Sequence, residues 1–231
     1  MVEAIGITAA AINATAILVG GAVGLLLKGR ITDSFSQSII RILGLCICII
    51  GIRSAVTGDI TLMVVSLVMG VIAGEALRID DGLNRLGLWA QKRFSSDKNS
   101  SFAEGFVTAT LLFSVGAMAI VGSIESGLRG DQSIIFTKSI LDGVSSLIFA
   151  SSLGVGVLFS AFVVLIYQGT LEIFAGYLQN VLTSYLITQI SAVGGVLIFA
   201  IGLNLALGTK FKVANLLPCF VFTAIYYYII L

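Results

Sequence analysis

Long apolar runs recur along the whole chain and constrain its fold more than any other feature. A helix that crosses a bilayer needs about 20 mostly apolar residues. Hydrophobic residues make up 58% of the chain and charged residues 11%, against about 25% charged in soluble domains. We therefore predict an all-α, polytopic transmembrane helical bundle of about eight helical segments. In chain order, the predicted segments are residues 4–27, 38–56, 60–77, 104–124, 136–152, 155–178, 189–208 and 213–231.

The fifth and sixth segments are separated only by a small-residue stretch, Ser151 to Gly156. Three arrangements fit this stretch: a hairpin of two complete helices, a single broken span, or a re-entrant pair. Broken helices are common at transporter sites, where freed backbone groups line a cavity. The charge distribution described next favours an even number of crossings, and hence the hairpin or the re-entrant pair.

Positive charge is distributed unevenly between the two sides of this predicted bundle. Loops rich in Lys and Arg stay cytoplasmic, and only Arg53, Arg129 and Lys138 fall on the other side. Both termini are then predicted outside, in an inner or plasma membrane. The cytoplasmic set is Lys28, Arg30, Arg41, Arg78, Arg85, Lys92, Arg93, Lys98, Lys210 and Lys212.

The segment 78–103 is the longest polar stretch and is predicted to be cytoplasmic. Within it, residues 79–94 carry an apolar face, which is typical of a short helix lying in the headgroup layer. The chain is treated as a single transmembrane domain, 1–231, with N-terminal spans in 1–77 and C-terminal spans in 104–231.

Charged side chains within spans are costly and usually face a cavity or a partner. Asp142 lies about two turns into the fifth segment, and Lys138 lies four residues earlier on the same face. The pair is either a structural ion pair or a binding carboxylate whose charge Lys138 modulates. Glu172, in contrast, is interpreted as lying near an interface.

Uncharged polar residues also interrupt the apolar segments, and their amides and hydroxyls can coordinate a polar solute or a cation. The residues are Asn13, Ser114, Gln168, Asn204 and Asn215. They either converge on one polar cavity or make scattered hydrogen bonds between helices. With Asp142 and Lys138, we take Asn13, Ser114, Gln168 and Asn204 as the candidate substrate- or ion-binding set.

Glycines at four-residue spacing are the strongest helix-packing signal. Gly20 and Gly24 form one line, and Gly70 and Gly74 form another. Such lines let helix backbones approach closely. They serve either packing within the chain or the face of a homodimer.

The sequence carries no recognisable catalytic or metal-binding motif, and we predict neither an enzyme nor a cofactor. Histidine is absent, and Cys46, Cys48 and Cys219 lack metal-ligand spacing. No phosphate-binding GxxxxGK[ST] loop is present. A net charge of +1 gives no indication of nucleic-acid binding.

Several long motifs resemble the YdfK/YqgA-like family of bacterial membrane proteins, which is catalogued as a domain of unknown function. The motifs are FVTATLLFSVGAMAIVGSIESGLRGD, KSILDGVSSLIFASSLGVGVLFSAFVVLIYQG, AVGGVLIFAIGLNL and KVANLLP. The resemblance covers essentially the whole chain and implies a cytoplasmic-membrane protein, sometimes described as a transporter. It implies no established substrate.

Two functions from different classes fit these observations. The first is a secondary transporter or permease for a small ion or polar solute. The second is a non-transporting membrane scaffold or regulator that assembles through its glycine-rich helix faces, for example as a homodimer. In this reading the segment 78–103 binds a cytoplasmic partner. A channel is a third possibility.

Overall fold

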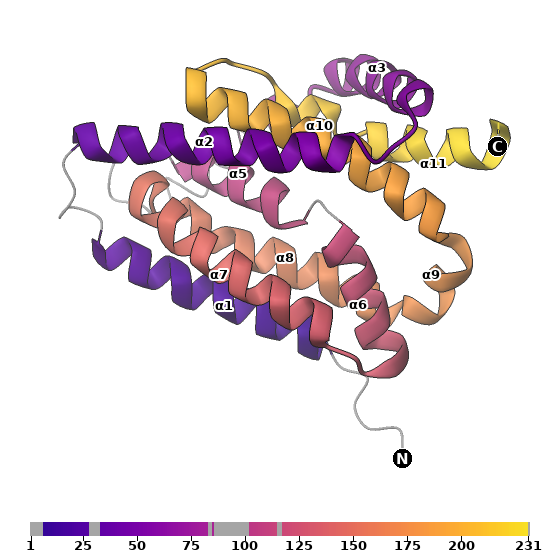
Figure 1. Ribbon diagram of the computed structural model, residues 1–231, viewed down its shortest axis with the longest axis horizontal. Helices are drawn as coiled ribbons and strands as arrows, with labels where there is room; N and C mark the ends of the chain where they lie inside the picture. The colour runs from indigo at the N-terminus through magenta and orange to yellow at the C-terminus, as the bar shows by residue number, and fades with distance from the viewer. Residues whose placement is uncertain (1–6, 28–32, 83–84, 86–101, 115–116, 231) are drawn as a thin grey trace. The chain divides into compact units, whose positions relative to one another are not determined.

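Every secondary-structure element in the described part of the chain is a helix, as its apolar runs predict. The computed structural model describes residues 7–27, 33–82, 85, 102–114 and 117–230 (Figure 1). The labelled elements are α1 (Thr8–Leu27), α2 (Asp33–Ala55), α3 (Ile60–Leu77), α5 (Phe102–Ser114), α6 (Ala117–Arg129), α7 (Ser133–Leu153), α8 (Gly156–Ile173), α9 (Ala175–Val181), α10 (Ser184–Leu207), the 3₁₀ helix η1 (Val213–Leu216) and α11 (Cys219–Ile230). The helical bundle is therefore confirmed, although the number of helices differs from the predicted eight.

Within the described residues, five helices are long and apolar enough to cross a membrane: α1, α3, α7, α8 and α10. A sixth candidate is formed if α5 and α6 count as one span bent by 58°. Many of their large side chains face outward, such as Leu26 at 77% exposed and Ile166 at 70%. An apolar exterior of this kind suits contact with lipid tails and not with water.

The break between α7 and α8 lies where the sequence predicts it, but other helix breaks do not. α7 and α8 are two separate helices of 21 and 18 residues, joined at Gly154, whose φ of 85° suits glycine. A further break falls inside the predicted fourth segment, between α5 and α6. Within the predicted sixth segment, α8 ends at Ile173 and a second helix, α9, follows. The predicted eighth is η1 followed by a short α11. Hydropathy averages over a window and therefore does not locate helix ends within an apolar run.

The proposed interfacial helix at 79–94 lies largely outside the described residues, which exclude 83–84 and 86–101.

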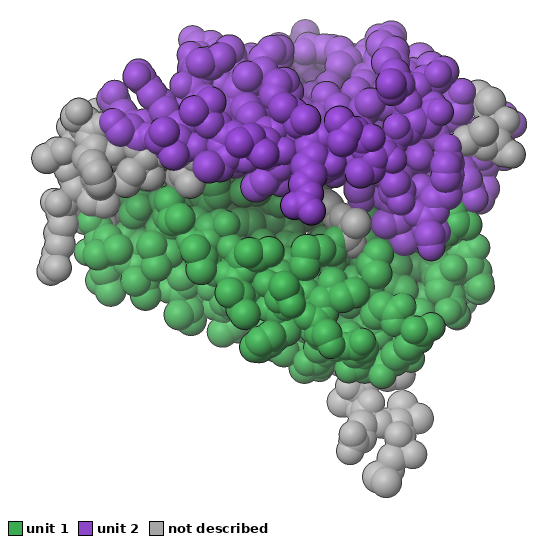
Figure 2. Space-filling view, in the orientation of Figure 1, with its two compact units in different colours: residues 1–36, 87–183 green, residues 37–86, 184–231 purple. Residues whose placement is uncertain are grey.

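Contacts divide the helices into two compact units, each built from separate stretches of the chain (Figure 2). Unit 1 comprises residues 1–36 and 87–183, and unit 2 comprises residues 37–86 and 184–231. Unit 1 contains α1 and α5 to α9. Unit 2 contains nearly all of α2, together with α3, α10, η1 and α11. Neither unit is one continuous segment, so the chain passes between them more than once.

In unit 1, α1 packs against both α7 and α8 (Figure 1). It runs parallel to α7, because Asn13 bonds to Asp142 and the Ile17 carbonyl accepts from Ser146. It runs antiparallel to α8, because Asn13 also bonds to Gln168 whereas Ala9 bonds to Glu172. These directions match the order of crossings expected for the first, fifth and sixth segments.

Glycines bring these helix backbones into direct contact. A Cβ on Gly20 would overlap the carbonyl oxygen of Gly143, and one on Gly24 would overlap that of Leu147. In unit 2, a Cβ on Gly70 would collide with Cys219, and one on Gly74 with the Asn215 carbonyl. All four glycines of the predicted lines are therefore in contact with helices of their own unit.

We expect Gly20→Ala to destabilise the protein by about 1–3 kcal/mol, because the new methyl group forces α1 away from α7. The free energy of unfolding in detergent measures this effect. Gly176→Ala is a matched control, since a Cβ on this helical glycine meets nothing within 4 Å. It should be neutral or slightly stabilising. Equal effects of the two substitutions would contradict tight packing of α1 on α7.

Candidate functional site

A buried ion pair lies in the N-terminal half of α7. Lys138 and Asp142 are one turn apart, form a salt bridge, and are only 6% and 7% exposed. Their order is not one that helix stability favours, because a carboxylate stabilises best when it precedes the Lys. Lys138 also lies in the second turn of α7, towards the positive end of the helix dipole. Local helix energetics therefore do not explain the pair.

Asn13 of α1 joins this ion pair to α8. Its Nδ2 donates to Asp142 Oδ2 at 3.0 Å and to Gln168 Oε1 at 3.1 Å. Both Asn13 and Gln168 are fully buried. The Asp142 carboxylate requires a donor, which sets the orientation of the Asn13 amide. The Asn13 amide in turn requires the Gln168 oxygen to face it. The four residues Asn13, Lys138, Asp142 and Gln168 are called the polar cluster below.

Two buried atoms of the polar cluster have no hydrogen-bond partner. They are the acceptor Asn13 Oδ1 and the donor Gln168 Nε2. A buried polar atom without a partner costs about 1–3 kcal/mol. Such atoms mark a place where a further polar group, from water or from a ligand, would be stabilised.

Glu172 holds α1 in place one turn beyond Gln168 on α8. Its two carboxylate oxygens accept from the backbone nitrogens of Ala9 at 3.1 Å and Ala10 at 3.3 Å. These N–H groups belong to the first turn of α1, where no intrahelical acceptor is available and a negative charge is favoured. Glu172 is 1% exposed, so it is a buried part of unit 1, one residue before the end of α8. Its location near a membrane interface stays a prediction. The four-residue spacing of Gln168 and Glu172 places both side chains on one face of α8. This spacing is the sequence signal that could have assigned Glu172 to the same site.

Two residues of the predicted binding set lie elsewhere. Asn204 belongs to unit 2, where its Nδ2 donates to the Phe211 carbonyl at 2.9 Å and its Oδ1 accepts from Phe211 N at 2.9 Å. Its amide therefore closes the loop after α10. Ser114 is the last residue of α5 in unit 1, and its buried hydroxyl has no hydrogen-bond partner.

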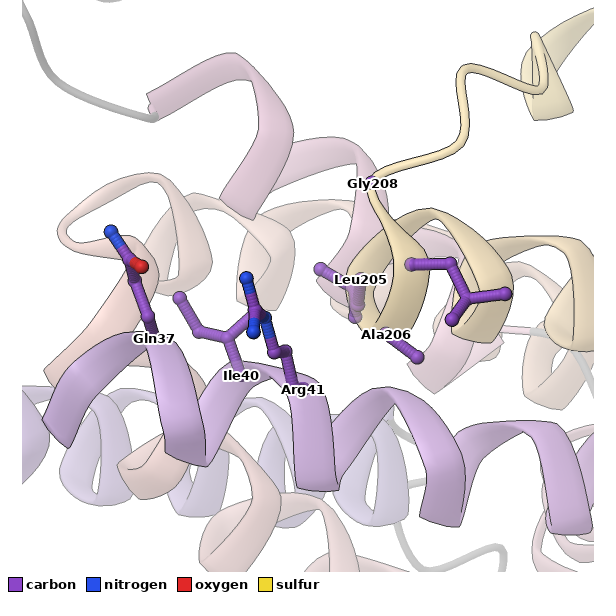
Figure 3. A pocket seen from close by; sticks show the side chains of 7 residues that line it. Gln37, Ile40, Arg41, Leu205, Ala206 and Gly208 are labelled. Atoms are coloured by element: carbon purple, nitrogen blue, oxygen red, sulfur yellow. The ribbon is translucent and has the colours of Figure 1, made fainter. Parts of the chain in front are cut away.

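Unit 2 contains a concavity of a different character. It encloses about 400 Å³ between α2 and the end of α10. Figure 3 shows Gln37 and Arg41 rising from α2 beside Leu205, Ala206 and Gly208 of the α10 end. Both polar side chains are exposed, and the other lining residues are apolar or glycine. This concavity lacks the buried donors and acceptors of the polar cluster, so the cluster is the stronger candidate site.

Unit 2 also has an ion pair, but it is exposed. Lys212 Nζ lies 3.5 Å from Glu75 Oε2, and both side chains are about half exposed. Asn215 donates to Glu75 at 2.8 Å and accepts from the backbone nitrogen of Asp80 at 2.7 Å. These contacts tie the end of α3 to η1, which is a structural role.

We expect Lys138→Gln and Asp142→Asn each to lower the free energy of unfolding by about 3–5 kcal/mol, because each leaves one buried charge unpaired. The double substitution should cost less than either single one, because it leaves no unpaired charge. Chemical denaturation of all three variants measures this coupling.

The exposed pair supplies the matched control for that measurement. Lys212→Gln and Glu75→Gln should each cost at most about 1 kcal/mol. Additive effects at Lys138 and Asp142 would show that the two side chains are not coupled, contrary to the geometry of the polar cluster.

Comparison with known proteins places this architecture in a family. The family described as "Protein of unknown function (DUF554)" matches residues 8–228. The chain is 33% identical over 212 residues to "Uncharacterized membrane protein YdfK" of Bacillus subtilis (strain 168), covering 89% of both chains. It is 34% identical over 212 residues to "Uncharacterized protein YqgA" of Escherichia coli (strain K12), covering 90% of both. No solved structure matches. The apolar helices and these relatives together identify a membrane protein, and the chain belongs to the DUF554 family.

Proposed function

We propose that this protein is a secondary transporter or permease for a small ion or polar solute, with the polar cluster as its binding site. The observation that carries the proposal is a buried ion pair within α7 whose amide neighbours retain an unpartnered acceptor and an unpartnered donor. Transporter sites typically lie near the middle of the membrane, between helices of one bundle.

Energetics support a binding role over a structural one. Replacing a buried ion pair with apolar side chains of similar volume is often neutral or stabilising. Charged groups within a membrane are expensive and commonly mark the path of a substrate or ion. Lys138 and Asp142 thus add cost without an evident gain in stability, and the two unpartnered amide atoms add more.

Transport would be passive or driven by an ion gradient, because the sequence contains no GxxxxGK[ST] motif for a nucleotide. An enzymatic role has less support, since the chain has no histidine and no recognisable nucleophile. We propose that the protein is not an enzyme.

We further propose a bacterial cytoplasmic-membrane location with both termini outside and residues 78–103 in the cytoplasm, on the basis of the Lys and Arg distribution. In that orientation, the start of α1, the start of α7 and the end of α8 face outward. The polar cluster then lies between the membrane centre and the outer face.

The scaffold alternative loses its main support from helix packing. It requires free glycine faces, yet Gly20, Gly24, Gly70 and Gly74 all contact helices of their own unit. A homodimer would therefore have to use other surfaces. The remaining basis for a scaffold is the segment 78–103.

The proposal is tested by the thermal stability of the purified protein against a broad panel of inorganic ions, neutral polar solutes and zwitterions. A ligand that binds the folded state stabilises it by about 2.7 kcal/mol at a hundred times its dissociation constant. We expect at least one compound to raise the melting temperature of the wild type and not of the Lys138→Gln/Asp142→Asn variant. Lys212→Gln/Glu75→Gln should respond like the wild type. A full response in the first variant, or none across the whole panel, would contradict the proposal.

A further inference from the structure

We infer that the polar cluster binds a small zwitterion, a molecule that carries one ammonium and one carboxylate group. This inference rests on the proposed function and specifies its substrate class. It follows from the charges and the unpartnered atoms of four side chains on α1, α7 and α8.

The charge balance of the site selects the ligand class. Without a ligand, the Lys138 ammonium and the Asp142 carboxylate neutralise each other. A simple cation that displaced Lys138 from Asp142 would leave a buried ammonium unpaired. A simple anion that displaced Asp142 would leave a buried carboxylate unpaired. A zwitterion can bind with its ammonium on Asp142 and its carboxylate on Lys138, so that neither buried charge loses its partner.

The unpartnered amide atoms match the same ligand. Asn13 Oδ1 is a free acceptor beside Asp142, and an ammonium group offers three donors. Gln168 Nε2 is a free donor, and a carboxylate accepts several hydrogen bonds. The cluster therefore offers two acceptors for an ammonium group and two donors for a carboxylate.

The other ionisable groups on the helices around this site leave its balance unchanged. The Glu172 carboxylate of α8 is bound to the backbone of Ala9 and Ala10. On α6, Glu125 and Arg129 pair with each other at 3.1 Å. On α8, Tyr167 lies beside Gln168, and on α5, Glu104 lies in the first turn. The described part of α1 contributes no charged residue.

The spacing of the pair limits the size of the zwitterion. Lys138 and Asp142 project from adjacent turns of one helix, which are about 5.4 Å apart along its axis. The ligand's two charged groups must then be separated by only a few bonds, as in α-amino acids and their short β- and γ-homologues. Helix spacing sets this limit, because both charges of the protein come from α7.

The test compares zwitterions with analogues that lack one charge. Glycine, alanine, β-alanine and γ-aminobutyrate are added to the purified full-length protein, each matched with methylammonium chloride, sodium acetate and sodium chloride at the same concentration. We expect at least one zwitterion to raise the melting temperature on the order of 5 °C at saturation. The single-charge analogues should leave it unchanged.

Variants locate the response within the site. Lys138→Gln/Asp142→Asn removes both charges without leaving one unpaired, so it should fold and lose the response. The Lys212→Gln/Glu75→Gln variant should keep it. Asn13→Ala and Gln168→Ala should each weaken binding about tenfold, because each removes one hydrogen-bonding group to a charged ligand.

Three results would overturn the inference. If methylammonium or an inorganic cation stabilised the protein as strongly as every zwitterion, the site would bind cations, and the transporter proposal would stand with a different substrate. If no zwitterion acted while a neutral solute did, the zwitterion inference alone would fail. If no compound of the broad panel raised the melting temperature, both the inference and the proposed function would be contradicted.

Discussion

Direct contact between the backbones of α1 and α7 is the constraint on which the candidate site depends. Asn13 has a short side chain, and it reaches Asp142 only because the two helices touch. Gly20 lies against the Gly143 carbonyl and Gly24 against that of Leu147, so any side chain at either position would separate the helices. The close packing of α1 on α7 at these glycines therefore also makes the contacts of the polar cluster possible.

A series of hydrogen bonds offsets the cost of burying polar groups between these helices. Glu172 bonds the first turn of α1 to α8 and so fixes the position of α1 along that helix. Asn13 then lies at the correct height to bond both Asp142 and Gln168. What this arrangement leaves unsatisfied is small and specific: one acceptor and one donor.

Sequence reasoning predicted the helical class and several helix bounds, and α3 was predicted to the residue at 60–77. Polar residues within apolar runs are visible without a structure, and four of the six in the predicted set lie together. Asn204 does not, because single-sequence patterns do not report which helices share a unit, and the chain alternates between units. The bonds from Glu172 to α1 were missed for a related reason: a single sequence does not show which helix start lies against a carboxylate at a helix end. The bend between α5 and α6 lies in a run whose hydropathy is continuous.

A transport role for the polar cluster requires that its side chains, which are buried in this structure, become accessible to water. Accessibility of a cysteine at position 139 tests it most directly, since Ser139 lies one turn from Asp142 and is 3% exposed. The background would replace Cys46, Cys48 and Cys219, the free cysteines. Asp131→Cys in the loop before α7 serves as the accessible control, and Ala161→Cys, at a position 1% exposed on α8, as the buried one.

We predict that a membrane-impermeant thiol reagent modifies Ser139→Cys in intact membranes. The rate of modification should be lower than that of Asp131→Cys and well above that of Ala161→Cys. Modification no faster than at Ala161→Cys would show that the cluster stays sealed, and would contradict a transport role.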